Sequence, residues 1–391
     1  MSIEKPIFPY FQPIICTASG KIIGYEALAR QQDDNGDIVS AGHLFTATDA
    51  ASDQQLLLLD RLVRRQALEQ FKALKSKAYL AINISASWID HLEDFSALPT
   101  LQMLQELEID KSRIIVEITE SKVELKKLIN AVKEYRKHGI KVAVDDFGTG
   151  YSQLERVVAM RPDIIKLDMK LFKKAAKGGV ERDLVHLITS LSQRTASRIV
   201  CEGVESNEEF FYALSCGSQF MQGYLFSKPE AEFKTPDHYQ SQIQQLRKKF
   251  LKRTTSREQK KINIIKRIKD LIEILRKSLE TDFNLNELAT YPFEQSGILR
   301  FYLCDNQGNQ ISSNFNFSDG KWFEEHREFG FNWSWRPYFY ELLALESIDD
   351  HYRLVTSEPY RDFSTSLLCK TMSIRLDAER ILLIDVIAEW L

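Results

Sequence analysis

Two adjacent carboxylates, Asp145 and Asp146, stand at the end of an apolar stretch within AVDDFGTGYSQL (residues 143–154). Alternating apolar residues before them predict a strand that ends at the aspartates. Gly148 and Gly150 follow, and they indicate a loop because glycine destabilises the interior of a helix. Neighbouring like charges repel unless water or a cation separates them. At the end of an apolar strand, the pair favours a metal site over an ordinary polar turn.

Polar residues recur near the C-terminal ends of the other short apolar segments. They are Glu26, Asn83, Glu117, Lys166, Asp168, Glu202 and Gln222. So many carboxylates in one place cannot all stay ionised without cations. All-oxygen ligation selects Mg²⁺, Mn²⁺ or Ca²⁺ over Zn²⁺. Two such ions are the usual arrangement for phosphodiester hydrolysis, and Lys166 would add positive charge for the attacking water or the developing negative charge.

Each of these residues also has a structural interpretation when it is taken alone. Glu26 would be an ion-pair partner, Asn83 a turn or backbone-capping residue, Lys166 a structural salt bridge, and Asp168 a helix N-cap. Their occurrence together, at successive strand ends, favours a metal-dependent phosphoester hydrolase whose substrate the chemistry does not name. The seven histidines fall outside these positions and are interpreted as surface or packing residues.

The elements that must position these residues alternate along the first 235 residues. Predicted strands cover 22–28, 79–84, 114–118, 140–146, 164–167, 198–201 and 220–226, and helical patterns cover 56–74, 124–138 and 184–192. Such units form either a closed barrel or an open doubly wound sheet. An open sheet gathers ligand groups at one switch point, whereas here almost every strand carries one. Residues 1–235 are therefore predicted to form a TIM-type (β/α)8 barrel.

The rest of the chain differs from the first 235 residues in composition and in its predicted elements. Residues 236–284 predict a polar linker helix, with a short coiled-coil-like seam at Ile265, Ile268, Ile272, Leu275 and Leu279. Its many Lys and Arg residues are interpreted as a solvated face, because no aromatic residues interleave with them as in nucleic-acid sites. Residues 285–391 predict a small α+β domain, with strands over 299–304, 366–374 and 381–387 and a hairpin turn at 305–309.

Length and composition set wider limits. A chain of 391 residues suggests two domains. The net charge of -3 argues against a general nucleic-acid binder. Neither a transmembrane span nor a signal peptide is expected from the apolar runs. Five scattered cysteines without a CxxC pair suggest reduced thiols, and a cytoplasmic protein is expected.

Eight blocks over residues 11–229 resemble the EAL domain, the cyclic di-GMP phosphodiesterase family. In order they are FQPI (11–14), EALAR (26–30), AINIS (81–85), VEITES (116–121), VDDFGTGYSQL (144–154), PDIIKLD (162–168), CEGVES (201–206) and MQGYLFSKP (221–229). A lone EAL tripeptide carries no weight, whereas eight ordered blocks are highly specific. The departures are Ala29, where the family usually has Leu, and Cys201, where it usually has Ala.

The resemblance implies hydrolysis of cyclic di-GMP to linear pGpG with Mg²⁺ or Mn²⁺, held as two ions. The implied metal ligands are Glu26, Asn83, Glu117, Asp145 and Asp146, with Asp145 shared between the ions. Lys166 would position the attacking water, Glu202 would be either a general base or a metal-side ligand, and Glu120 would brace the loop 147–152. The implied substrate-side residues are Gln12, Leu28, Arg30, Asp168, Glu205, Gln222 and Pro229. The alternative is a catalytically silent receptor that signals by binding cyclic di-GMP.

The segments 301–315 and 332–340 resemble the PAS-like, Cache-like domain that follows EAL in YkuI-type proteins. That resemblance implies a pocket for a small cytosolic ligand, in which Arg336 would bind a carboxylate and aromatic residues such as Trp335 would form walls. The aromatic residues are equally compatible with a simple core, and the domain with a dimerisation unit. A homodimer is expected, as is common among relatives.

Overall fold

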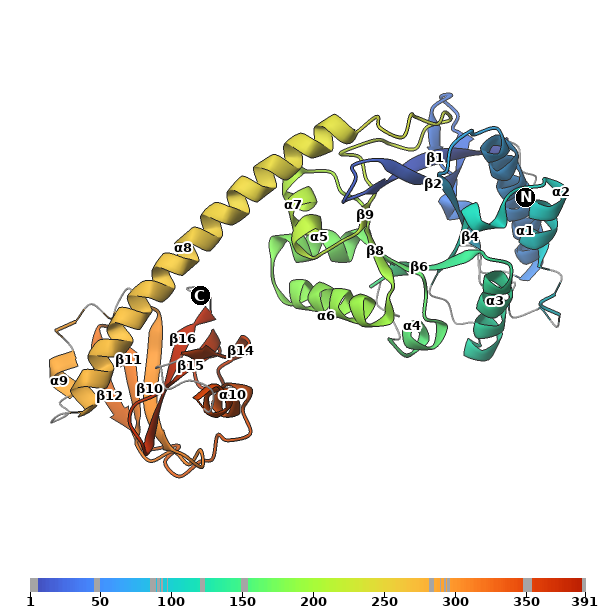
Figure 1. Cartoon of the computed structure of the whole chain (residues 1–391). Coiled ribbons are helices and arrows are strands. Elements are labelled where there is room, and N and C mark those ends of the chain that lie inside the picture. The colour runs from blue at the N-terminus through green and yellow to red at the C-terminus, as the bar shows by residue number, and fades with distance from the viewer. Residues whose placement is uncertain are drawn as a thin grey trace. The chain divides into compact units, whose positions relative to one another are not determined.

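The computed structural model describes residues 6–45, 50–84, 89, 92, 94–96, 98–119, 124–148, 154–280, 285–288, 290–291, 293, 296–346 and 354–388. The chain divides into two compact units, Met1–Phe250 and Leu251–Leu391. Helix α8 (Gln240–Glu280) crosses this division (Figure 1). Among the described residues, no helix combines the length and apolar character that crossing a membrane requires.

The first unit is a closed barrel of eight strands surrounded by helices. The strands are β1 (Ile7–Cys16), β2 (Ile22–Gln32), β4 (Tyr79–Ile84), β5 (Ile114–Thr119), β6 (Lys141–Phe147), β7 (Ile164–Leu167), β8 (Arg198–Cys201) and β9 (Phe220–Met221). Their order is β1-β9-β8-β7-β6-β5-β4-β2, and pairing of β1 with β2 closes the ring. The short β3 (Ile38–Ser40) pairs with β2. The predicted barrel is confirmed.

Helices alternate with most of these strands along the chain (Figure 1). They are α1 (Ala50–Lys72), α2 (Pro99–Glu106), α3 (Leu125–Lys137), α4 (Leu154–Met160), α5 (Met169–Lys177), α6 (Val180–Thr195) and α7 (Asn207–Ser215). Two single-turn helices, Gly42–Phe45 and Lys111–Arg113, precede α1 and β5. The large core cluster joins the outward faces of the strands to these helices.

Strand β1 departs from the all-parallel pattern of a (β/α)8 barrel, because it runs antiparallel to both β2 and β9. Only residues 17–21 connect β1 to β2, a hairpin length, whereas a parallel crossover needs roughly a dozen residues or more. The antiparallel register sets Gln12 opposite Glu26. The hairpin thus brings two predicted site residues together.

Alternation along the parallel strands decides which side chains enter the barrel. Along β6, Val142 and Val144 join the core beneath the helices, while Ala143 joins a separate cluster with residues of seven other segments inside the ring. Successive strand residues point to opposite faces, so Asp145 lies on the same inner face as Ala143. In the same way, Asn83 and Glu117 lie two residues after Ala81 and Ile115 on their strands, and so on the same inner face. The polar residues thereby form one layer at the C-terminal end of the barrel.

The second unit is an antiparallel sheet with helices. Its strands are β10 (Ile298–Asp305), β11 (Asn314–Ser318), β12 (Lys321–Glu325), β13 (Val355–Thr356), β14 (Tyr360–Arg361), β15 (Leu368–Arg375) and β16 (Arg380–Ile387). The order is β12-β11-β10-β16-β15-β13, with β14 beside β15. The described helices besides α8 are α9 (Leu285–Leu288) and α10 (Pro337–Glu346). The predicted α+β composition and the turn after β10 are confirmed, although the chain forms an isolated bridge at Gln310 before β11 begins at Asn314.

The two faces of this sheet pack against different helices. On one face, Phe301 and Ile384 lie in a cluster with the apolar seam of α8. On the other, Tyr302 and Leu383 lie in a cluster with Phe339 of α10. The seam residues Ile268, Ile272, Leu275 and Leu279 are at most 6% exposed within the single chain. The seam predicted from the spacing is therefore a core face of its own unit, which packs on the sheet.

Candidate metal centre

Lys166 stands at the centre of the polar layer. Its ammonium nitrogen lies 2.8 Å from Glu202 Oε1 and 2.9 Å from Asp145 Oδ1. It also lies 3.0 Å from Glu117 Oε2 and 3.2 Å from Glu26 Oε2. These side chains come from β2, β5, β6 and β7 and from the residue after β8. The structure therefore brings together five residues that are spread over 177 positions of the sequence, from 26 to 202.

Amide side chains hold Glu26 from two sides. Asn83 Nδ2 donates a hydrogen bond of 3.1 Å to Glu26 Oε1, and Gln222 Nε2 donates one of 2.5 Å to Glu26 Oε2. Gln222 Nε2 also donates to Gln12 Oε1 over 2.9 Å, and Gln12 Nε2 donates to the carbonyl of Ser227 over 3.0 Å. Glu26, Gln12 and Gln222 are each at most 7% exposed. This network fixes the Glu26 carboxylate on the inner face of β2.

A strand irregularity places both aspartates of the Asp145-Asp146 pair at the site. The pairing of β6 with β7 shifts register between Val144 and Phe147, and Asp146 has a φ of 54°. A bulge re-aims side chains that would otherwise alternate between faces. As a result, carboxylate oxygens of Asp145, Asp146 and Glu202 come within 4.8 Å of one another. Oxygens of Asp145, Glu26 and Glu117 form a second group within the same limit.

Burial and mutual repulsion shift the protonation equilibria of this cluster. Burial raises the pKa of Glu202 to about 8 and holds the pKa of Glu117 well above its usual range. Burial and the charge of Asp145 raise the pKa of Asp146 to about 6. For Glu26, burial raises the pKa, but Lys166 and the two amide donors lower it further than burial raises it. One lysine does not neutralise so many buried carboxylates, so the cluster favours an added cation.

The residues present fit divalent cations that prefer oxygen. The donors are carboxylate oxygens, with the amide of Asn83 beside them, and no sulfur or imidazole is among the two groups. Hard cations such as Mg²⁺, Mn²⁺ and Ca²⁺ are bound by such sets. Gln222 Oε1 is buried without a hydrogen-bond partner among the described residues, so the network around Glu26 contains one further oxygen acceptor that is not engaged.

Glycines hold the loops that carry Glu202 and Gln222 in close contact. A Cβ atom on Gly223 would lie 2.2 Å from the carbonyl oxygen of Val204. The two loops also exchange a backbone hydrogen bond, from the Val204 amide to the Gln222 carbonyl, of 3.1 Å. Only glycine permits this approach of two backbones. The conformations around Glu202 and Gln222 are therefore coupled.

A cavity of about 320 Å³ lies beside the metal-ligand candidates. Leu28, Arg30 and Asn83 line it, and so do residues of α1. Arg30 Nη1 donates a 2.8 Å hydrogen bond to the carbonyl of Ala29, and burial lowers the pKa of this guanidinium. Two predicted substrate-side residues therefore share one cavity with a predicted metal ligand.

Other predicted residues lie apart from the cluster or have structural partners. Asp168 caps α5 by accepting from the amides of Lys170 and Leu171, at 2.9 and 3.0 Å, as its structural interpretation proposed. Glu205 is exposed and pairs with Lys173 at 2.7 Å. Pro229 is half-buried beside the bridge between Phe11 and Glu230. Glu120 lies outside the described residues, as do residues 149–153 of the predicted loop.

The sequence analysis missed one charged pair in the cavity wall. Asp60 and Arg64 of α1 line the cavity and form an ion pair, and Arg64 is only 4% exposed. Arg64 Nη1 also donates to Thr100 Oγ1 over 3.1 Å. The i, i+4 spacing of opposite charges was the available signal. It is also a common pattern on exposed helix faces, so the spacing did not indicate burial.

Comparisons with known proteins agree with this geometry. The EAL domain model matches residues 2–229, and the model of the EAL-domain associated signalling protein domain matches residues 233–391. The EAL-domain containing protein YkuI of Bacillus subtilis is 30% identical over 399 residues, covering 97% of this chain and 94% of YkuI. The crystal structure of YkuI, in complex with substrate c-di-GMP and calcium, has a TM-score of 0.81 at 27% identity and covers 97% of this chain and 96% of that chain.

Other relatives match little more than half of this chain. The cyclic di-GMP phosphodiesterase PdeR of Escherichia coli is 32% identical over 225 residues, which cover 56% of this chain and 33% of PdeR. Klebsiella pneumoniae BlrP1, in its manganese and cy-diGMP complex, has a TM-score of 0.50 at 28% identity, over 58% of this chain and 56% of that chain. These solved structures bind calcium or manganese together with the dinucleotide. With residues 2–229 matched by the domain model and YkuI matched along nearly its whole length, the chain belongs to the EAL-domain family.

Proposed function

We propose that this chain hydrolyses cyclic di-GMP to linear pGpG in a reaction that depends on Mg²⁺ or Mn²⁺. The observation that carries the proposal is the convergence of Glu26, Glu117, Asp145 and Glu202 around Lys166. Such a cluster is costly to bury for structure alone, because replacing buried ion pairs by apolar residues is often neutral or stabilising. Cyclic di-GMP is proposed as the substrate because the relatives are named for it or bind it. The carboxylate cluster supports metal-dependent phosphodiester hydrolysis as the reaction.

The donor groups suggest how two ions would be shared. Glu26, Asn83, Glu117 and Asp145 would hold the first ion. The second would be held by Asp145, Asp146 and Glu202, whose oxygens already lie within 4.8 Å of one another. When bound, such ions lower the pKa of a coordinated water and stabilise the attacking and leaving oxygens. We therefore propose Glu202 as a metal-side ligand, not as the general base.

The remaining residues act on water and substrate. Water attacks one phosphorus, the bond from phosphorus to the 3′ oxygen breaks, and that oxygen takes a proton, leaving a 5′-phosphate on linear pGpG. The ammonium of Lys166 would hold the attacking water and offset negative charge on the phosphoryl oxygens. Arg30, in the adjacent cavity, would offer a planar set of donors to a phosphate or a guanine edge. The other substrate-side residues would be Gln12, Leu28, Asp168, Glu205, Gln222 and Pro229.

We propose residues 1–235 as the catalytic domain, 236–284 as a linker helix, and 285–391 as a domain that senses a signal or supports a homodimer. The match of the second domain model to residues 233–391 supports a signalling role. Glu120 would brace the loop 147–152 between the metal centre and the dimer interface.

The test compares the full-length chain with two variants, in Mg²⁺ or Mn²⁺ and with a chelator control. We expect pGpG from the unchanged chain and from Glu69→Gln, whose side chain is exposed on α1. Glu26→Gln should lose activity by on the order of 10²-fold or more, because a fixed ligand becomes neutral. Tight binding of intact cyclic di-GMP without product, even in Mn²⁺, would establish the silent receptor instead.

A further inference from the structure

Two thiols meet beside the metal centre. Cys201 is the last residue of β8, and Cys216 caps the C-terminal end of α7. Their sulfur atoms lie 4.0 Å apart, and both residues are free cysteines. Glu202, a proposed metal ligand, directly follows Cys201 in the chain. A pair of thiols that the proposed hydrolysis does not use therefore lies next to the metal centre.

Hydrogen bonds give the two thiols different roles. Cys216 Sγ donates to the carbonyl of Ala213 over 3.4 Å. A thiol carries a single proton, so the hydrogen bond between the two sulfurs comes from Cys201. That hydrogen bond, helped by two backbone amides, lowers the pKa of Cys216 further than burial raises it. Because the thiolate is the nucleophile, Cys216 is the thiol of this pair that reacts first with an electrophile.

The position of Cys216 offers a small oxidant a route. Cys216 itself is 4% exposed, but its neighbours Ser215 and Gly217 are both exposed. Gly217 follows the helix with a φ of 76°, and no described atom lies within 4 Å of its Cβ position. The last turn of a helix opens locally more readily than the core of a barrel. Cys201, by contrast, is fully buried on a strand with neighbours on both sides, so we expect oxidation to begin at Cys216.

Hydrogen peroxide is an oxidant that suits this pair. The Cys216 thiolate attacks one peroxide oxygen, the O–O bond breaks, and the hydroxide that leaves takes up a proton to become water. The sulfenic acid on Cys216 is then attacked by the Cys201 sulfur. The S–O bond breaks, and the second oxygen leaves as water with the proton from Cys201. The net reaction converts two thiols and one hydrogen peroxide into one disulfide and two waters.

Disulfide formation draws β8 and α7 together. A sulfur–sulfur bond is about 2.05 Å long, so the two sulfurs must approach each other by about 2 Å. β8 lies between β7 and β9, and Cys201 pairs with Leu167 on one side and with Met221 on the other. α7 packs on the barrel through side chains such as Phe210. Packed helices slide more easily than a strand that is paired on both sides, so we expect α7 to shift.

A shift of α7 reaches the metal centre through the segment that joins them. Ser206 and Glu209 form a capping box at the start of α7. Glu209 Oε2 also accepts from the backbone amide of Glu205, over 2.7 Å. These bonds fix α7 to residues 203–206, which directly follow Glu202. A displaced α7 therefore pulls on Glu202, whose carboxylate moves relative to the others of the cluster.

We propose that Cys201 and Cys216 are a redox modification site, at which peroxide forms a reversible disulfide that weakens metal binding at Glu202. Only the effect on metal binding rests on the proposed metal centre, because the disulfide involves the thiols alone. Disulfides that form transiently in reducing compartments commonly sense redox conditions. EAL domains usually have Ala at the position of Cys201, so Cys201→Ala should fold and keep the metal centre.

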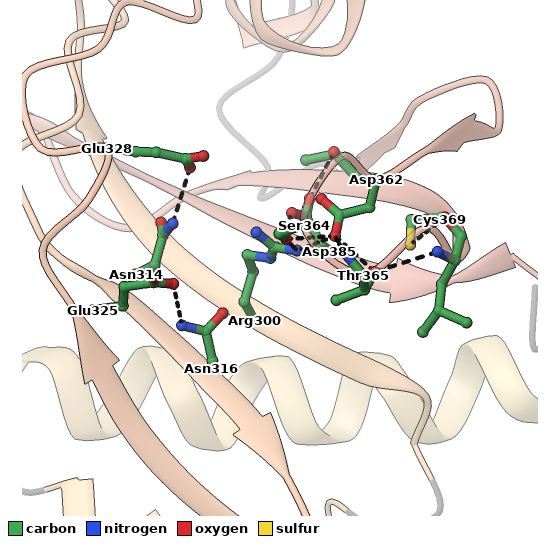
Figure 2. Close-up of polar contacts among 12 residues, drawn as sticks. Arg300, Asn314, Asn316, Glu325, Glu328, Asp362, Ser364, Thr365, Cys369 and Asp385 are labelled. Atoms are coloured by element: carbon green, nitrogen blue, oxygen red, sulfur yellow. Dashed lines mark hydrogen bonds and ion pairs between the residues drawn. The ribbon is translucent and has the colours of Figure 1, made fainter.

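The first test detects the disulfide in the full-length chain. The chain is treated with hydrogen peroxide in a chelator, the remaining thiols are blocked, and a protease that cleaves after glutamate cuts between the two cysteines, as at Glu205. We expect the two fragments to stay joined until dithiothreitol separates them, and Cys201→Ala to give no joined fragments. Cys369→Ala is the matched control: Cys369 is also buried, but its thiol donates to the Leu367 carbonyl over 3.4 Å (Figure 2), so the link should form as in the unchanged chain.

The second test measures Mn²⁺ affinity before and after peroxide treatment, once the peroxide and the chelator are removed. We expect the linked chain to bind Mn²⁺ about tenfold more weakly, with recovery in dithiothreitol, and Cys201→Ala to keep its affinity. Absence of joined fragments from the unchanged chain, or joined fragments with unchanged Mn²⁺ affinity, would overturn the proposal. A reduced chain that binds no Mn²⁺ would overturn the coupling together with the metal centre. A reduced chain that binds Mn²⁺ but forms no pGpG would count against the proposed hydrolysis alone.

Discussion

The Nζ atom of Lys166 lies 2.9 Å from Oδ1 of Asp145, and their side chains are 1% and 10% exposed. The adjacent strands β6 and β7 hold this pair at the inner face of the barrel. Three further carboxylates lie within 3.2 Å of the same nitrogen. Lys166 is therefore both a proposed reaction residue and the internal cation of the cluster, and this double role has consequences for stability.

Replacing Lys166 by Met should make folding dependent on added metal. Without the ammonium, the four carboxylates lose their shared internal cation, which costs about 3–5 kcal/mol for a broken buried pair. We expect Lys166→Met to unfold at lower denaturant concentration than the unchanged chain in a chelator, and Mn²⁺ to restore more stability to the variant. Lys170→Met, at an exposed position, is the control. Equal stability of Lys166→Met and the unchanged chain in chelator would contradict the internal-cation role.

Replacing Glu202 by Gln distinguishes a metal ligand from a general base. Since Glu202 shares its group of oxygens with Asp145 and Asp146, we expect Glu202→Gln to weaken Mn²⁺ binding by about 10–100-fold, with partial recovery of turnover at saturating Mn²⁺. Titration with Mn²⁺ and steady-state rates measure the two quantities separately. Normal Mn²⁺ affinity with a rate loss of about 10²–10⁴-fold would assign Glu202 as the general base.

A methyl group at Gly223 should disturb the site without touching a charged residue. The Cβ of Gly223→Ala would lie 2.2 Å from the Val204 carbonyl oxygen, and a backbone atom cannot move aside as a flexible side chain can. We expect a stability loss of about 1–3 kcal/mol and a lower turnover, because Gln222 moves away from Glu26. Gly139→Ala is the comparison for turnover: its φ of 78° makes an alanine strained there too, but its Cβ would meet no described atom within 4 Å, so we expect a stability loss without a loss of turnover. Unchanged turnover in Gly223→Ala would show that the two loops are not coupled.

Truncating Leu275 tests the role of the α8 seam. Leu275 is fully buried in the second unit, so Leu275→Ala should cost about 2–5 kcal/mol in that unit. Tryptophan fluorescence during urea unfolding follows this unit, because four of the five tryptophans lie beyond residue 250. Ile262→Ala, on the same helix but 63% exposed, should change stability by less than about 0.5 kcal/mol. A changed oligomeric state with unchanged stability in Leu275→Ala would restore the coiled-coil interpretation.

The sequence predicted the elements that carry the chemistry closely. The predicted strands 79–84, 164–167 and 198–201 coincide with β4, β7 and β8. Most residues of these parallel strands are buried, and short apolar runs followed by a polar residue mark their ends clearly. The position of a polar residue at a strand end also predicted which side chains meet, because parallel strands present their C-terminal ends on one side.

The remaining features depend on partners that lie far away in the sequence. The bulge that re-aims Asp146 arises from the pairing of β6 with β7. The apolar spacing of Ile268 to Leu279 marks a buried face, but not whether a second helix or a sheet covers it. Likewise, the aromatic run before α10 did not reveal that Trp333 is half-buried while Trp335 is 63% exposed. Periodicity identifies a buried face, and the tertiary contacts decide what lies against it.

Analysis of the nucleotide product in water enriched in ¹⁸O tests the central claim most directly. The full-length chain is incubated with cyclic di-GMP and Mn²⁺, with a chelator in parallel, and the nucleotides are separated and weighed by mass spectrometry. The account predicts linear pGpG with one ¹⁸O atom on its 5′-phosphate, formed only when the metal is present. Cyclic di-GMP that stays intact in Mn²⁺, or pGpG that forms equally in the chelator, would contradict it.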